Sequence, residues 1–231
     1  MTNAVLAAVL LASLADVAAA QELIEFPIPN GPVLSPAEQT KVIEKARDNA
    51  LQYLGNLPNF ICIEAIRRYQ KGKPAESWKA FDTLVLDVSY NDHGESHKLV
   101  SINGKPTRKK YISDEVGGYV VSGNFGSALW RIFSPESHAK FHWERWTNLR
   151  GRSSHVFAYS IEQPDSKWIM RRGKKKDTFA FRGLIYVDDE THQIMRLTET
   201  VDSFTADWPF REAQSEIDYG YVDLDGKKFL L

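Results

Sequence analysis

The chain of 231 residues is 43% hydrophobic and 26% charged, and its formal net charge at pH 7 is −1. This size and composition are typical of a globular protein of one domain, or at most two. The near-neutral charge argues against nucleic acid as the main partner, because binding to phosphates needs a basic surface. The single cysteine, Cys62, excludes an internal disulfide, and its apolar neighbours favour a buried structural role over a nucleophilic one.

Residues 1–20 differ in composition from the rest of the chain. They contain no Lys or Arg, are apolar from Ala4 to Leu14, and end in three alanines before Gln21. The apolar run is too short to span a membrane, and its small final residues fit the cleavage site of a secretory signal peptide. Because the usual basic n-region is missing, an N-terminal helix of the fold is the alternative. Cleavage after Ala20 would remove one acid, leaving 29 basic and 30 − 1 = 29 acidic residues. We predict a periplasmic or secreted protein.

A linker and a long helix follow the predicted signal peptide. Residues 21–34 hold three prolines and one glycine, which disfavour regular structure. Ser35 is a natural N-cap, Pro36 fits the first helical position, and Glu38 completes a capping box. We predict a helix from Pro36 to about Leu54, ended by Gly55. Its buried stripe is formed by the apolar residues at helical spacing, which are Val42, Ile43, Ala46, Ala50, Tyr53 and Leu54.

After this helix the period of the apolar residues changes to two, which indicates β-strands. Within residues 83–90 one face carries Leu84, Leu86 and Val88, and the other carries Thr83, Asp87 and Ser89. Residues 213–221 repeat the pattern, with Ile217 and Tyr219 opposite Glu216 and Asp218. Further strands are predicted within residues 59–70, 97–102, 141–146, 153–161, 167–171, 178–181, 183–187 and 193–201. A short second helix is predicted within residues 124–133, ended by Pro135.

These elements predict one α+β domain over residues 35–231, with a long antiparallel meander sheet and the two helices packed on it. Several strands, such as residues 59–70 and 153–161, are apolar on both faces and need cover on both sides. Ten strands span about 48 Å, and one helix about 28 Å long is too small to cover them. We therefore predict that the sheet curls into a half-barrel whose concave face binds a hydrophobic ligand. A packed sandwich or barrel without a cavity is the alternative.

The predicted ligand-binding residues are the apolar positions of the two clearest strands and of the short helix, the latter as a lid. They are Leu84, Leu86, Val88, Ile217 and Tyr219, with Trp130 and Phe133.

Clusters of acidic residues and histidines offer weaker signals of chemistry. Residues 188–192 place three carboxylates and His192 between two apolar runs, but lack the spaced oxygen ligands and the glycine of a calcium loop. We predict that they form the tip of a hairpin. His93 and His97, with Asp92 and Glu95 nearby, have the density of a ligand set, but residues 91–95 also fit an exposed turn in which solvated histidines need no function. His138 and His142 have a spacing that binds zinc only on a helix, and a strand is predicted there. We predict no catalytic residue, no metal and no cofactor.

A basic run occupies residues 171–177 between two predicted strands. Its cations are Arg171, Arg172, Lys174, Lys175 and Lys176. A solvated loop that discourages edge-to-edge pairing is the simpler interpretation. The alternative is a patch that makes transient contact with the anionic surface of a membrane.

The C-terminal third resembles the half-barrel superfamily of outer-membrane lipoprotein carriers (LolA/LolB-like). The resemblance lies in a strand, an acidic turn and a strand, followed by an Asp-Tyr strand and an Asp-Gly turn. The matching residues are Tyr186, Val187, Asp188, Glu190, Thr191, Arg196, Leu197, Asp218, Tyr219, Asp225 and Gly226. Residues 57–62, 123–133 and 143–159 are similar to a family of uncharacterised exported bacterial proteins. The resemblance implies a half-barrel that binds acyl chains through nonspecific apolar side chains, with further strands beyond Leu231.

The sequence thus predicts an exported, non-enzymatic protein that binds a hydrophobic small molecule, a lipid or a lipoprotein in an apolar concave face of its sheet. A structural or protein-interaction module of the cell envelope, without a ligand, is the alternative from another class. A metal-dependent hydrolase is the third, and it depends only on the His and Asp clusters.

Overall fold

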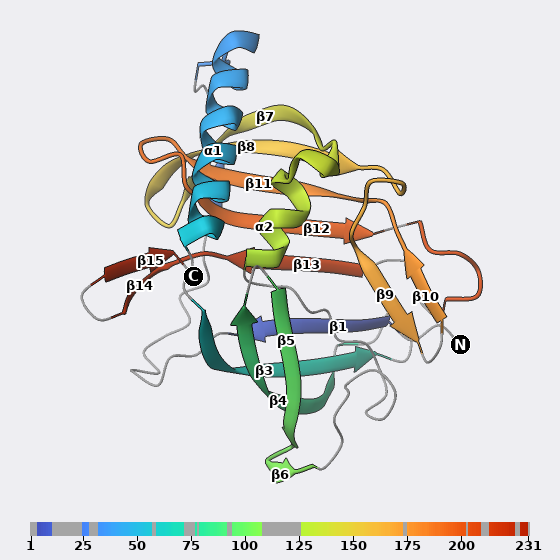
Figure 1. The fold of residues 1–231 in the computed structure, drawn as a ribbon. Helices are drawn as coiled ribbons and strands as arrows, with labels where there is room; N and C mark the ends of the chain where they lie inside the picture. The colour runs from blue at the N-terminus through green and yellow to red at the C-terminus, as the bar shows by residue number, and fades with distance from the viewer. Residues whose placement is uncertain are drawn as a thin grey trace.

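The protein has an α+β fold with two α-helices and mostly antiparallel sheets among its described residues (Figure 1). The computed structural model describes residues 4–10, 25–27, 32–56, 59–71, 77, 79–91, 94–107, 126–172, 175–201, 203–208, 213–224 and 227–230. Their strands form two main sheets and two small two-stranded sheets. The α+β prediction is confirmed.

Helix α1 (Pro36–Asn56) begins at the predicted capping box. The Ser35 backbone N–H and hydroxyl donate to the Glu38 carboxylate at 2.8 and 2.7 Å, and the Glu38 N–H donates to Ser35 Oγ at 3.4 Å. These bonds satisfy backbone donors that the first turn of a helix leaves without partners. The buried stripe consists of Val42, Ala46, Ala50 and Leu54, with Ile43 and Tyr53 partly buried beside it. The predicted helix is confirmed, except that it continues through Gly55, the predicted stop, to Asn56.

The five-stranded sheet lies at the bottom of Figure 1 and has the order β1-β3-β4-β5-β6. Its strands are β1 (Ala4–Leu10), β3 (Phe60–Lys71), β4 (Lys79–Asn91), β5 (Gly94–Ile102) and β6 (Lys105–Pro106). Asn103 and Gly104, between β5 and β6, both have positive φ (50° and 74°). An Asn-Gly pair suits such a turn, because both residues tolerate this conformation better than other residues do.

The six-stranded sheet has the order β13-β12-β11-β8-β7-β2. Its strands are β2 (Glu25–Pro27), β7 (Lys140–Leu149), β8 (Arg152–Ile161), β11 (Phe181–Asp188), β12 (Ile194–Val201) and β13 (Ala213–Asp218). Two small antiparallel sheets consist of β9 (Ile169–Arg172) with β10 (Lys175–Thr178), and of β14 (Tyr221–Leu224) with β15 (Lys227–Leu230). Strand β2 lies in the predicted linker, where it pairs with β7 at the edge of the sheet, a place that tolerates proline.

The main core lies between the six-stranded sheet and the two helices, α1 and α2 (Gly126–Phe133), which cross in front of it in Figure 1. A 3₁₀ turn, η1 (Pro135–Ser137), follows α2. A second apolar cluster, on the five-stranded sheet, contains Ile66, Leu84, Leu86, Val88 and Leu99. A third, smaller cluster on the six-stranded sheet contains Leu149, Val156, Tyr186 and Met195.

The strand pattern agrees with the sequence in type and differs in two details. The meander order holds within each sheet, but the strands divide between two sheets that are not closed, with β13 next to β1 at their boundary. The half-barrel curvature therefore stays a prediction. The strand predicted at residues 178–181 is absent, because β10 ends at Thr178 and β11 begins at Phe181. Phe179 turns into the core instead, where its ring lies 5.6 Å from that of Trp208.

Candidate functional site

The predicted ligand-binding residues lie in two separate apolar clusters. Leu84, Leu86 and Val88 belong to the five-stranded sheet, and each has 0% of its surface exposed. Phe133 and Tyr219 are buried in the main core, where Trp130 and Ile217 are partly buried beside them. The structure therefore does not bring the seven residues together as one lining.

The first turn of α2 connects these two clusters. A Cβ atom on Gly126 would lie 2.7 Å from both Leu54 Cδ2 and Tyr90 Oη, so the helix begins in close contact with α1 and β4. The hydroxyl and the backbone N–H of Ser127 both donate to Glu95 Oε1 of β5, at 2.9 and 3.4 Å. A carboxylate is favourable there, because the N-terminus of a helix carries a partial positive charge.

Glu95 is part of a buried polar cluster on the five-stranded sheet, formed by Glu64, Glu95 and His97. His97 Nε2 lies 3.7 Å from both Glu64 Oε2 and Glu95 Oε2, and the three side chains are only 1–8% exposed. Burial lowers the pKa of His97, and the Glu95 carboxylate opposes this shift. Burial, with Glu64 and Glu95, raises the pKa of the half-buried Cys62 thiol, in agreement with a structural cysteine. This cluster resembles an acid/base site in composition.

Sequence reasoning named two members of this cluster, Glu95 and His97, but expected a solvated turn there. His97 was expected to be solvated, but its side chain is 8% exposed, because it lies on the inward face of β5 opposite Val88. Its predicted neighbour His93 lies outside the described residues. Glu64 could have been found from strand parity, since it lies between the inward positions Cys62 and Ile66.

A second buried polar network holds α2 on the six-stranded sheet. Arg131 of α2 donates from Nη2 to both oxygens of Glu199 at 2.9 and 3.2 Å, and the Ser215 hydroxyl donates to Glu199 Oε2 at 3.0 Å. Burial by itself would lower the pKa of Arg131, but the Glu199 carboxylate more than offsets this effect and raises it. Because its acceptors and donors are matched, the network acts as a fixed anchor of the helix.

Residues 188–192 form a hairpin tip, as predicted. Asp188 accepts from Arg152 Nε and Nη2 at 2.5 and 2.8 Å, and from the backbone N–H and hydroxyl of Thr191 at 2.8 and 2.7 Å. Burial raises the pKa of Asp188, but these bonds outweigh it and bring the pKa to about 2. His192 closes the turn with a φ of 59°. Among the described residues, no group of three or more His, Cys, Asp or Glu side chains is arranged to hold a metal ion.

Next to this tip, His155 gives the molecule a testable pH dependence. It is 2% exposed, lies against Trp146 at 4.0 Å between ring centroids, and has Nε2 3.0 Å from Asp189 Oδ1. Burial lowers its pKa, which Asp189 only partly opposes. The unfolded chain then binds the proton more readily, so stability is complete above the ordinary histidine pKa of about 6.5 and falls as the pH drops below it.

We therefore expect the free energy of unfolding, measured by urea titration, to decrease between pH 7 and pH 5. The decrease should be smaller in His155→Gln, which retains an amide to face Asp189. His138→Gln is the matched control, because the His138 side chain is 70% exposed. An equal pH slope in the three proteins would contradict the expectation.

The other predicted polar sites lie at the surface. His138, just before β7, forms an ion pair with Asp165 at 3.1 Å, and His142 is an exposed residue of β7. Neither histidine lies on a helix, in agreement with the prediction. In the basic run, Lys175 contacts Asp207 and lies 3.2 Å from Asp177. Lys174 and the side chains of Arg171 and Arg172 lie outside the described residues, and membrane contact stays a prediction.

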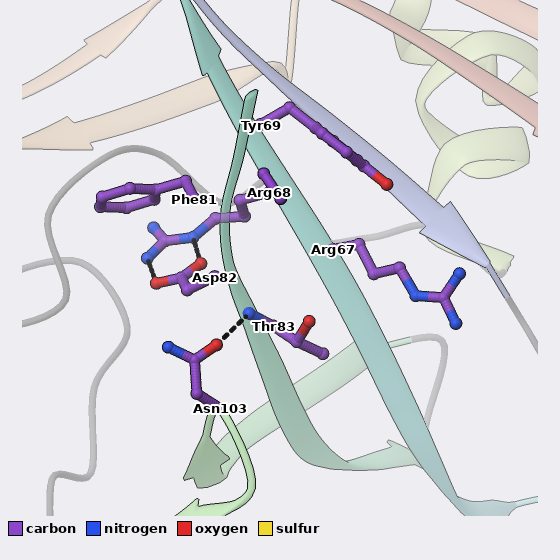
Figure 2. Close-up of a pocket in the computed structure, with 8 residues that line it drawn as sticks. Arg67, Arg68, Tyr69, Phe81, Asp82, Thr83 and Asn103 are labelled. Carbon is purple, nitrogen blue, oxygen red and sulfur yellow. Dashed lines mark hydrogen bonds and ion pairs between the residues drawn. The ribbon is translucent and has the colours of Figure 1, made fainter. Parts of the chain in front are cut away.

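A pocket of about 170 Å³ lies between β3, β4 and the turn after β5 (Figure 2). Arg68 forms a paired ion bridge with Asp82, and its guanidinium lies 4.9 Å from the centre of the Phe81 ring. Asn103 Oδ1 accepts the backbone N–H of Thr83 at 2.9 Å. None of the predicted ligand-binding residues lines this pocket, whose lining combines the charged Arg67, Arg68 and Asp82 with the aromatic Tyr69 and Phe81.

The outer face of β3, opposite to the face that carries Cys62, Glu64 and Ile66, has two large exposed apolar side chains. Ile61 is 83% exposed and Ile63 is 70% exposed. Their neighbours across β4 are polar, because Ile61 pairs with Ser89 and Ile63 with Asp87. The strand is therefore apolar on both faces, as predicted, and its outer face leaves Ile61 and Ile63 exposed.

Comparisons with protein-family models, with curated proteins and with solved structures gave no match. Neither described helix is both long enough and apolar enough to cross a membrane.

Proposed function

We propose that this protein is an exported, non-enzymatic binding module that holds an apolar ligand or a lipidated partner against its five-stranded sheet. The observation that carries the proposal is the exposure of Ile61 and Ile63 on a strand whose other face is already packed. Covering an isoleucine side chain is worth about 1.5–3 kcal/mol. Two such side chains on one face of one strand supply a driving force for association that the isolated chain does not use.

The inner face of the same sheet supports the proposal in a different way. Leu84, Leu86 and Val88, which the sequence predicts as lining residues, are fully packed. They form a rigid apolar layer directly behind the outer face, so a ligand can bind outside without opening the core. A ligand on the inner face would instead have to separate the sheet from the residues that cover it. The outer face of β3 is therefore the first contact surface in this proposal.

The test is the binding of a fluorescent fatty acid to the purified protein. We expect Ile63→Ser to weaken binding by about tenfold, which corresponds to a loss of about 1.4 kcal/mol of apolar contact. Val33→Ser is the matched control, because Val33 is also an exposed apolar residue (79%) but lies just before α1, outside the sheet. Its binding should equal that of the unchanged protein. Equal binding by both variants, or no binding by any of them, would count against an apolar ligand on this face.

A protein-interaction module without a small ligand is the second candidate. It is favoured by the polar residues Ser89 and Asp87 beside the two isoleucines, since an apolar centre with a polar rim is common in protein interfaces. A protein that binds no fatty acid but associates with a partner through Ile61 and Ile63 would support this candidate.

A further inference from the structure

The outer face of β3 changes from apolar to polar along the strand. Because side chains alternate along a strand, Arg67 lies on the same face as the exposed Ile61 and Ile63. Thr83 is directly opposite Arg67 on β4 and shares this face. Figure 2 shows Arg67 and Tyr69 projecting from the same side of β3. The face is therefore apolar at Ile61 and cationic at Arg67.

A pocket lies at the polar end of this face. Arg67, Tyr69 and Thr83 belong to the lining of the pocket of about 170 Å³ between β3 and β4. A water molecule takes about 30 Å³ of the liquid, so a carboxylate and its first methylene groups fit a volume of this size. Within the part of the chain that the structure describes, the Arg67 guanidinium has no ion pair, and the hydroxyls of Tyr69 and Thr83 make no hydrogen bond. These three donors can therefore bind an anion.

The remaining charged groups of the pocket bind each other. Arg68 donates from Nε and Nη2 to the two carboxylate oxygens of Asp82. Figure 2 shows this pair on the side of β3 opposite to Arg67. The lining contains two arginines and one aspartate, so its net charge is 2 − 1 = +1. The charge of the pocket is thus complementary to a single negative charge, and Arg67 is the group that supplies it.

The distance between the two ends of the face is similar to the length of one acyl chain. Arg67 and Ile61 are six positions apart on β3, which corresponds to about 20 Å on an extended strand. The hydrocarbon core of a bilayer is about 30 Å thick and two acyl chains deep, so one chain extends about 15 Å. A carboxylate at Arg67 therefore directs the chain across Ile63 toward Ile61. Asp87, which is opposite Ile63 on β4, disfavours the reverse orientation, because it would repel the carboxylate.

We propose that the outer face of β3 binds a fatty acid, with the carboxylate in the pocket at Arg67 and the acyl chain along β3 over Ile63 and Ile61. This inference rests on the proposed function and names the ligand class and its orientation on the same face. The Arg67 guanidinium donates two parallel hydrogen bonds to the carboxylate, and the hydroxyls of Tyr69 and Thr83 donate to its remaining lone pairs. A neutral chain of equal length makes only the apolar contacts.

The test compares a tail-labelled fluorescent fatty acid with the fatty alcohol of the same length and label. We expect the purified full chain to bind the acid about fivefold more tightly than the alcohol, the upper range for an exposed ion pair. Arg67→Gln should weaken binding of the acid by this factor and leave binding of the alcohol unchanged. Added salt should have the same selective effect in the unchanged protein, because screening acts on charge.

Lys98→Gln is the matched control for the loss of one positive charge. Lys98 is an exposed residue of the same sheet face, but it lies on β5 opposite Asp87 and does not line the pocket. Its substitution should leave the ratio of the two affinities unchanged. Arg67→Lys keeps the charge and loses the forked donor, so it should retain only part of the preference for the acid.

Equal affinities for the acid and the alcohol, or a preference for the acid that persists in Arg67→Gln, would overturn the carboxylate site. Ile63→Ser separates this failure from failure of the proposed function. If it weakens binding of both amphiphiles while the acid has no advantage, the apolar face stands and only the site at Arg67 is lost. If the unchanged protein binds neither amphiphile, the proposed function and this inference are both wrong.

Discussion

Glu199→Ala is expected to lower the free energy of unfolding by about 3–5 kcal/mol, the usual cost of removing one partner of a buried ion pair. The substitution leaves the guanidinium of Arg131, a residue that is 9% exposed, without the carboxylate that accepts from its Nε and Nη2. It also removes the acceptor of the Ser215 hydroxyl and of the Trp168 indole N–H. Urea unfolding followed by tryptophan fluorescence measures the loss.

Two comparisons separate this buried pair from an ordinary charge effect. Replacing both partners, as in Arg131→Met with Glu199→Leu, should cost less than Glu199→Ala alone, because neither charge is then left buried. Glu162→Ala removes one partner of an exposed pair, Lys140 with Glu162 at 3.8 Å, and should cost less than about 1 kcal/mol. A cost for Glu199→Ala that is no larger than that of Glu162→Ala would contradict the buried network.

The position of Arg131 links this stability effect to the proposed binding face. Arg131 anchors α2 to the six-stranded sheet, while Ser127, one turn earlier, holds Glu95 of the five-stranded sheet. Loss of the anchor should therefore loosen the connection between the two sheets as well as the main core. Weaker fatty-acid binding in Glu199→Ala under conditions where the protein stays folded would show that the helix supports the binding face from behind.

Local signals in the sequence were sufficient for most of the elements. The capping box at Ser35 and Glu38 and the apolar spacing that follows located α1, because both depend on residues within one helix. The Asn103-Gly104 turn and the hairpin tip at Asp188 were equally local. Strand parity assigned Leu84, Leu86 and Val88 to the buried face of β4.

Pairings between distant residues could not be predicted in the same way. Arg131 and Glu199 are 68 positions apart, and neither local pattern indicates that the two side chains meet. The division of the strands into two sheets depends on which strand edges meet. The alternation of apolar and polar residues along one strand does not identify the neighbours of that strand. The place of β1 shows the same limit, since composition identified the segment as a signal peptide but not the edge of β3 on which it lies.

Between β11 and β12, one glycine permits a close approach of two backbones. Backbone pairing joins Arg182 to Thr200 and Ile185 to Leu197. Thr198 lies between these two pairs and makes other hydrogen bonds. The Leu184 N–H donates to Thr198 Oγ1 at 2.9 Å, and the Tyr159 hydroxyl donates to the Thr198 carbonyl at 2.8 Å. This arrangement brings the Thr198 carbonyl against Gly183.

Gly183→Ala is therefore expected to destabilise the protein by about 3 kcal/mol or more, the upper range for overpacking. The added Cβ would lie 1.8 Å from Thr198 O and 2.7 Å from Thr198 C, which are backbone atoms, and 3.0 Å from Tyr159 Cε1. The adjacent strands cannot separate there without breaking the two bonds to Thr198. Gly220→Ala is the matched control, because no atom lies within 4 Å of its added Cβ, and its stability should change by less than about 0.5 kcal/mol. The yield of soluble protein and the urea midpoint measure both variants, and equal values for the two would show that β11 and β12 do not approach each other this closely.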